Sequence, residues 1–202
     1  AKESLAYKNG FLKIPIIEYW LKELVLVIQC KFPDFTPVSR KFKFINTIDV
    51  DNAYCYLEKG LLRTLGAICR SLLQFDFNPI LDRIRVLLGK EKDPYDTFDY
   101  LLDIQKKHDF KSIYFFLLAD YGYNDKNIAH TSKKFQALVK TMADYVKVGI
   151  HPSWASSTDN HKLSKEINRL EAIVNREVIL SRQHFLRLDL PKTYRRLIDL
   201  GI

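Results

Sequence analysis

The apolar run Ser112–Leu118 constrains the fold of this chain more than any other segment. It is nearly continuous and rich in aromatic residues, which is the pattern of a strand buried on both faces. Such strands belong to parallel sheets whose faces are covered by helices. Shorter β-type runs predict further strands at Phe42–Asp49, Val148–Ile150 and Val178–Leu180.

Helical periodicity separates these strand segments. Leu57–Gln74 repeats leucine and isoleucine at helical spacing, and Asn78-Pro79 is a helix start that Gly89 closes. Further helices are predicted at Ile14–Cys30, at Thr97–Lys107, from a Ser132 cap to Val146, at Leu163–Val174 and between Pro191 and Gly201. Strands that alternate with helices predict an α/β fold with a parallel sheet, open or closed into a barrel, whose functional residues lie at the carboxyl ends of the strands.

The domain organisation follows from length and from two prolines. A chain of 202 residues with 47% hydrophobic content suits one domain with a small appendage. The prolines in Phe32–Pro37 end the first helical pattern, so residues 1–40 are predicted to form a helical lead-in and residues 41–202 the main domain. The apolar stretch Leu24–Ile28 is too short to span a bilayer. Because the chain begins at Ala1, an export signal or upstream domain could have been removed.

Charge and cysteine content limit the classes of function. The formal charge of +8 is spread over scattered pairs such as Lys106-Lys107 and Arg195-Arg196, and this dispersion disfavours a nucleic-acid partner. Such a partner would give binding that depends steeply on salt concentration. The three cysteines include no Cys-x-x-Cys spacing, so reduced thiols and a cytoplasmic location are expected.

Acidic and imidazole side chains follow several of the predicted strands. Asp49 and Asp51 stand at the end of the first, His151 follows the third, and Arg182 and His184 follow the fourth. In an extended segment, residues i and i+2 share a face, so both carboxylates could reach one ligand. Asp at a strand end is equally common as a turn or capping residue. Asp plus two His is also a ligand set for a divalent metal such as Zn²⁺, with a position left open for water.

Two aromatic residues are candidates for contact with a ligand. Trp154 lies close to His151 and could offer an apolar platform to a sugar, and Tyr121 in the long polar loop could line a cleft; packing on the domain is the alternative for both. The chain has no Gly-rich phosphate loop and no Gly-x-Ser-x-Gly elbow, which disfavours covalent serine catalysis.

At these residues the chain resembles the polysaccharide deacetylases with a NodB homology domain, in particular the Bacteroidetes-type variant with an uncharacterised N-terminal segment. The resemblance covers residues 42–202. The Asp-x-Asp first motif of that family matches Asp49-Val50-Asp51, and its Arg-to-aromatic third motif matches Arg182–Phe185. The second motif, His-x-x-x-His, is represented by Gly149–Ala155, where His151 is present and Ala155 stands in place of the second His.

The resemblance implies a NodB-type irregular (β/α) barrel and a role for each residue. Asp49 is the expected base, Asp51 and His151 are expected metal ligands, and Arg182 is expected to orient Asp49 by ion pairing. His184 is the candidate replacement for the missing ligand. The family domain continues through further strands, one of which bears the His that protonates the leaving amine, so the barrel is expected to be incomplete and to lack its last strands.

The implied function is metal-dependent deacetylation of an N-acetylated carbohydrate, with O-acetyl groups as the less favoured substrate. The alternative is a non-catalytic carbohydrate-binding or structural domain on the same fold, for which the missing second His and the missing general acid are the discriminating features. The sugar, the metal and the oligomeric state stay open.

Overall fold

A computed structural model describes residues 2–38 and 41–202 of the chain. The chain divides into two compact units, Ala1–Lys43 and Phe44–Ile202. The domain boundary predicted between residues 40 and 41 adjoins Ser39 and Arg40, which lie outside the described residues.

The first unit contains two helices, α1 (Leu5–Lys8) and α2 (Ile16–Lys31). The Ser4 hydroxyl caps α1 by accepting a hydrogen bond from the Tyr7 amide at 3.2 Å. The end of α2 precedes Pro33, which has no N–H to continue a helix. Neither helix has a buried residue. Across the described residues, no helix has both the length and the apolar character needed to cross a membrane.

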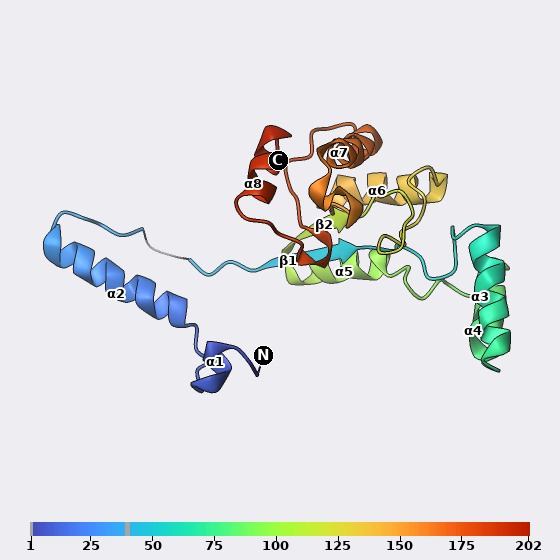
Figure 1. Ribbon diagram of the computed structural model, residues 1–202, viewed down its shortest axis with the longest axis horizontal. Coiled ribbons are helices and arrows are strands. Elements are labelled where there is room, and N and C mark those ends of the chain that lie inside the picture. The colour runs from blue at the N-terminus through green and yellow to red at the C-terminus, as the bar shows by residue number, and fades with distance from the viewer. Residues whose placement is uncertain (1, 39–40) are drawn as a thin grey trace. The chain divides into compact units, whose positions relative to one another are not determined.

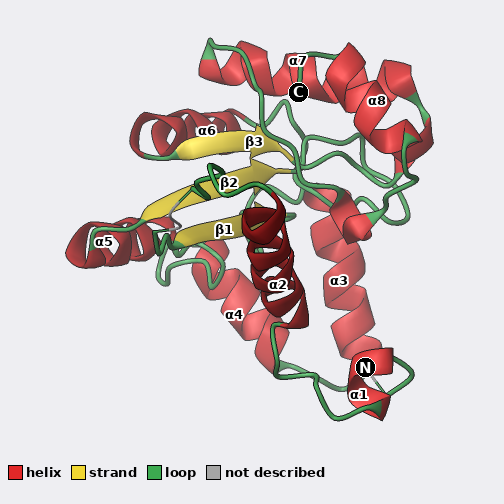
Figure 2. Ribbon diagram, turned by 90° about the vertical axis from the view of Figure 1, so that its left-hand side faces the viewer, coloured by secondary structure: helices red, strands yellow, loops and turns green. Residues whose placement is uncertain are grey.

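The second unit is built on a parallel sheet of three strands, β1 (Ile45–Val50), β2 (Lys111–Phe116) and β3 (Lys147–Ile150), which lie side by side in that order (Figure 2). Phe115 of β2 pairs with Asp49 on one side and with Gly149 on the other. The predicted parallel α/β fold and three of its predicted strands are therefore confirmed.

The fourth predicted strand, Val178–Leu180, is wrong as a strand. This segment runs parallel to β3, where the Ile150 amide donates to the Leu180 carbonyl at 2.9 Å, but only an isolated bridge joins Ile150 to Ser181. The Val178 amide is instead satisfied by the Glu171 carboxylate at 3.0 Å, so the ladder does not extend.

Gly149 allows this segment to approach β3 closely. A Cβ at Gly149 would lie 2.6 Å from the Leu180 carbonyl oxygen and 2.8 Å from the Phe115 ring. Only glycine fits between these two neighbours, so this position fixes how the segment that carries Arg182 and His184 lies against the sheet.

The helices of the second unit largely match the predicted segments. They are α3 (Leu61–Leu73), α4 (Asn78–Leu87), α5 (Phe98–His108), α6 (Lys133–Tyr145), α7 (Asn160–Val174) and α8 (Lys192–Asp199). The predicted start of α3 at Leu57 is wrong by four residues. The amides of Cys55, Tyr56 and Leu57 donate to the buried Asp93 carboxylate at 2.7–3.1 Å, which holds them in a loop.

The core lies where the sheet meets α6 and α7. Phe116, Val139, Ile150 and Leu170 have no exposed surface. The α3–α4 hairpin projects away from the sheet (Figure 1), and within these two helices only Val86 is buried. The well-packed part of the second unit is thus the sheet together with α6 and α7. This part carries the candidate site.

Candidate metal centre

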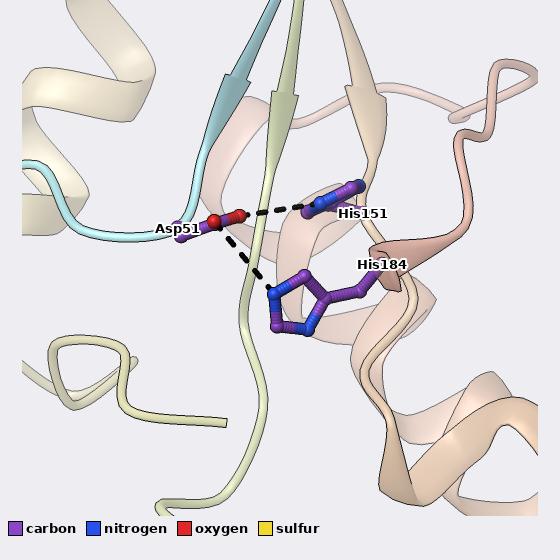
Figure 3. A group of neighbouring side chains, drawn as sticks. All are labelled: Asp51, His151 and His184. Atoms are coloured by element: carbon purple, nitrogen blue, oxygen red, sulfur yellow. Dashed lines mark ion pairs between the residues drawn. The ribbon is translucent and has the colours of Figure 1, made fainter. Parts of the chain in front are cut away.

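Three predicted metal ligands meet at the carboxyl ends of the strands. Asp51 directly follows β1, His151 directly follows β3, and His184 begins a short 3₁₀ turn, η2 (His184–Leu186). Their side chains converge (Figure 3): His151 Nε2 lies 3.2 Å from Asp51 Oδ1, and His184 Nε2 lies 3.7 Å from Asp51 Oδ2. Both imidazoles are buried, whereas the Asp51 side chain is half exposed.

The backbone fixes the tautomer of His151. Its Nδ1 lies 2.5 Å from the carbonyl oxygen of Arg182, and a carbonyl can only accept a hydrogen bond. Nδ1 must therefore carry the proton. In the neutral ring the lone pair of Nε2 then faces Asp51, which is the arrangement that a metal ligand needs.

A buried carboxylate fixes His184 in the same way. His184 Nδ1 lies 3.1 Å from Oδ1 of Asp125, a side chain that is only 2% exposed. Nδ1 donates to this carboxylate, so the Nε2 lone pair of the neutral ring also faces Asp51. Two lone pairs directed at one carboxylate require a cation between them, either a proton or a metal ion.

The pKa values of the cluster show the same attraction for positive charge. Hydrogen bonds with His151 and His184 hold the pKa of the Asp51 carboxyl well below its usual range. Burial by itself would lower the pKa of His184, but its contacts with Asp51 and Asp125 outweigh burial and raise it. The site thus stabilises a cation at the three facing ligand atoms.

The donor set fits a divalent metal. The facing atoms, two imidazole nitrogens and one carboxylate oxygen, all lie within 4.8 Å of one another. Ligand atoms around tetrahedral zinc are separated by about 3.3–3.6 Å, given bonds of about 2.0–2.2 Å. His151 Nε2 lies 3.2 Å from Asp51 Oδ1 and His184 Nε2 lies 3.7 Å from Oδ2, the other oxygen of the same carboxylate, and each distance is close to that spacing. Asp51, His151 and His184 could therefore hold a divalent ion and leave a coordination position open.

Asp49 lies beside this cluster and binds a different partner. The Arg182 guanidinium is 3.4 Å from Asp49 Oδ1 and donates to Thr47 Oγ1 at 2.8 Å. Among the described residues, no hydrogen bond or ion pair joins Asp49 to Asp51 or to either histidine. Arg182 connects the two groups, because its carbonyl holds His151 while its side chain holds Asp49.

Asp125 is the functional residue that the sequence interpretation missed. It lies in the long polar loop that also carries Tyr121, and its carboxylate binds His184 and accepts hydrogen bonds from the amides of Trp154 and Ala155 at 2.8 and 3.1 Å. Asp125 lies nine residues beyond the end of β2, and Asp120 comes earlier in the same loop, so the strand-end rule does not single it out. The Ala155 backbone, at the position of the second motif His, binds the carboxylate that orients His184.

A second buried acid supports the same loop. Glu166 of α7 accepts hydrogen bonds from the Ser153 amide at 3.0 Å, from the Ser153 hydroxyl at 2.6 Å and from the Ser156 hydroxyl at 3.0 Å. Burial raises the pKa of Glu166. The loop that follows His151 is thus held from two sides, by Asp125 and by Glu166.

Trp154 reaches the cluster through aromatic contacts, whereas Tyr121 does not. The Trp154 ring meets the Phe185 ring edge-on at 5.4 Å, and Phe185 lies 4.2 Å from the His184 ring. Arg187 stacks over Trp154 at 4.0 Å. Tyr121 stacks instead with Arg63 at 4.3 Å, and no described contact links it to the three ligands.

The chain directly after His184 is conformationally strained. Phe185 and Leu186 both have positive φ, 57° and 51°, in the left-handed region that side chains other than glycine rarely adopt. Such strain persists where the surrounding structure imposes it, and it often lies at functional sites. Here it aims the His184 ring at Asp51 while Phe185 turns toward Trp154.

No family model and no curated protein matches the chain. Among solved structures, the chain is similar to a mutant of BA3943, described as a CE4 family pseudoenzyme with restored enzymatic activity. CE4 is the NodB-type family. The two chains share 17% identity with a TM-score of 0.45, over 84% of this chain and 48% of the other. The chain therefore spans about half the length of the structure that it matches.

Proposed function

We propose that this chain is part of a metal-dependent hydrolase that removes an acetyl group from an N-acetylated carbohydrate. One observation carries the proposal. His151 and His184 each have Nδ1 bound to a fixed acceptor, so both Nε2 atoms face the Asp51 carboxylate. A pair of histidines oriented in this way by outer hydrogen bonds is the usual construction of a metal site.

The remaining residues supply the proton transfer of such a reaction. A divalent metal, with zinc as the proposed ion, supplies Lewis acidity toward the acetyl carbonyl and toward a water molecule. Asp49 is the proposed base, which accepts the proton of the attacking water. Arg182 holds Asp49 by an ion pair at 3.4 Å and, through its carbonyl, holds the His151 ring. Through Arg182, the position of the proposed base is fixed relative to that of the metal ligand His151.

Trp154 is the proposed contact for the sugar at the reaction centre. The residue is 37% exposed, and its ring lies next to Phe185, which contacts His184. An aromatic face pairs well with the apolar C–H face of a sugar.

The winding of the sheet is compatible with a barrel-type fold for the proposed enzyme. The strand order β1-β2-β3 is sequential, so each crossover moves in the same direction. Barrels are wound in this way, and so is each half of a doubly wound sheet, so the barrel is proposed from the resemblance to the NodB-type family. We propose that the strands belong to an irregular (β/α) barrel of NodB type.

The test combines metal analysis with acetate release. Protein loaded with zinc is expected to bind one ion and to release acetate from oligomers of N-acetylglucosamine. Asp49→Asn is expected to lower the rate by about 10²–10⁴-fold, the usual contribution of a general base, without loss of zinc. His184→Gln is expected to lower zinc affinity. Asp103→Asn and His161→Gln, which change exposed residues of α5 and α7, are the matched controls. Equal activity in Asp49→Asn and Asp103→Asn would contradict the proposed base.

A second candidate function has one observation in its favour. Ala155 replaces the second motif His, and its amide is engaged with Asp125. A carbohydrate-binding or structural domain without catalysis would tolerate that replacement. Zinc binding without acetate release that depends on Asp49 would favour this second candidate.

A further inference from the structure

The turn between α3 and α4 holds an aromatic residue in a backbone conformation that favours glycine. Phe75 has a φ of 54°, in the left-handed region that bulky side chains rarely adopt. Its amide donates to the Leu72 carbonyl at 3.1 Å, and the Asp76 amide donates to the Ser71 carbonyl at 3.0 Å. This pair of hydrogen bonds is the Schellman motif, which closes a helix and usually has glycine at the position of Phe75.

Two other helices of the second unit close with the same motif, and both use glycine. Gly89 follows α4 and Gly201 follows α8, with φ of 69° and 81° and with the same pattern of backbone hydrogen bonds. The left-handed conformation is unfavourable for other residues because Cβ lies too close to the following carbonyl oxygen. Phe75 therefore lowers the stability of the turn in which it lies.

The ring of Phe75 has little packing to offset this cost. The residue is 83% exposed, and no ring or cation stacks on it among the described residues. A Schellman motif often includes a hydrophobic contact between the residues that here are Asp76 and Ser71, and both are polar. An exposed aromatic side chain in a strained conformation points to a role in recognition rather than in folding.

Further apolar side chains surround Phe75 at the free end of the α3–α4 hairpin. The outer ends of the hairpin are attached to the rest of the second unit. Arg63 of α3 donates to the Asn127 carbonyl at 3.0 Å, and Asp93, which follows α4, binds the amides of Cys55–Leu57. The turn between the two helices is therefore the end that projects (Figure 1). Its apolar side chains, all exposed, are called the hairpin tip: Leu72, Leu73, Phe75 and Phe77.

The shape and the charge of the hairpin tip fit a lipid surface. Arg70 lies one helical turn before the tip, about 5.4 Å along the axis. It is exposed and has no ion-pair partner among the described residues. Interfacial segments bury their apolar side chains about 5–10 Å into the boundary between headgroups and acyl chains. A tip at that depth would bring the Arg70 guanidinium to the lipid phosphates.

Two further charges define the kind of surface and the depth. The net charge of +8 favours a surface with anionic lipids. Asp76 lies between Phe75 and Phe77, and a carboxylate is costly in hydrocarbon, so contact at the headgroup boundary is favoured over deeper insertion.

We propose that the hairpin tip inserts into the headgroup boundary of an anionic lipid bilayer, with Phe75 as its central side chain and Arg70 at the lipid phosphates. The tip thus attaches the second unit to a membrane surface. The inference is independent of the proposed hydrolysis, because neither residue belongs to the metal cluster.

The test removes the ring and relieves the strained backbone in one step. Phe75→Gly is expected to raise the urea midpoint of unfolding by about 0.5 M, since glycine suits this conformation. The same variant is expected to bind vesicles of phosphatidylcholine and phosphatidylglycerol about 10–100-fold more weakly, as loss of one buried Phe side chain would give. Cosedimentation with the vesicles measures binding. Asn175→Gly is the matched control, because Asn175 ends α7 with a φ of 52° and is exposed. It should bind vesicles like the unaltered chain.

Other variants test the direct contact with lipid. Phe75→Trp and Tyr100→Trp each place a Trp at an exposed position, in the tip and on α5. On addition of vesicles, only the fluorescence emission of Phe75→Trp is expected to shift to the blue. Arg70→Gln is expected to weaken binding to the anionic vesicles about fivefold and to leave binding to phosphatidylcholine alone unchanged.

Several results would overturn the inference. Equal vesicle binding by Phe75→Gly and Asn175→Gly would do so, as would a fall in the stability of Phe75→Gly, which would show that the ring packs in the fold. A dimer that forms without binding to vesicles and is lost in Phe75→Gly would identify a second copy of the chain as the occupant. Acetate release bears only on the proposed function, and it should be unchanged in Phe75→Gly with soluble oligomers.

Discussion

The replacement Asp125→Asn tests whether a buried carboxylate outside the ligand set controls the metal site. Asp125 is 2% exposed, and its two oxygens receive three donors: His184 Nδ1 and the Trp154 amide at Oδ1, and the Ala155 amide at Oδ2. Asparagine retains one oxygen. If that oxygen keeps the first two donors, the new NH₂ group faces the Ala155 amide and one hydrogen bond is lost.

The lost hydrogen bond and the lost negative charge each give an expected change, the first in folding free energy and the second in metal affinity. Leaving one buried amide unsatisfied costs about 1–3 kcal/mol of folding free energy in the metal-free protein. Loss of the negative partner of a ligating histidine lowers metal affinity by about 10–100-fold, or about 1.4–2.7 kcal/mol. Zinc affinity and stability should therefore both fall, by separately measurable amounts.

The assay titrates zinc into the protein against a chromophoric chelator and measures unfolding of the metal-free form in urea. Asp103→Asn, on the exposed face of α5, is the control for loss of one negative charge. If Asp125→Asn is less stable but binds zinc within twofold of the unaltered protein, Asp125 supports only the loop, and its negative charge does not strengthen His184 as a ligand.

Three further predictions concern packing and ionisation. Gly149→Ala should lower the free energy of unfolding by about 1–3 kcal/mol, because its Cβ would lie 2.6 Å from a backbone oxygen. Gly66→Ala, in open space on α3, should instead raise stability by up to about 1 kcal/mol, and equal effects in urea unfolding would refute the crowding argument. The raised pKa of Glu166 means that the folded protein favours its protonated form. The stability that Glu166 contributes relative to Glu166→Gln should therefore be largest in acid and decline as pH rises through that pKa; a difference that grows with pH would contradict burial as the cause. Burial, with Arg63 nearby, lowers the pKa of Lys59 to about 8, so an amine-selective reagent at pH 8 should label Lys59 before the exposed lysines, as peptide mass spectrometry would detect.

The elements of the fold were largely predictable because their signals are local. The continuous apolar run at Ser112–Leu118 predicted a buried parallel strand, and the structure has β2 there. Ser132 predicted a helix start, and its hydroxyl caps α6. The errors arose where distant groups take over local hydrogen bonds. Asp93 delays the start of α3, and Glu171 takes the Val178 amide that a fourth strand would have used.

The sequence by itself named Asp51, His151 and His184 as possible ligands, because the strand-end rule needs only the order of strands and polar residues along the chain. Only the tertiary structure decided which ring nitrogens face the carboxylate and which group orients them. Those choices depend on a backbone carbonyl 31 residues from His151 and on a carboxylate 59 residues from His184. Neither spacing follows from local patterns, because contacts of this kind form only when the strands and loops pack together.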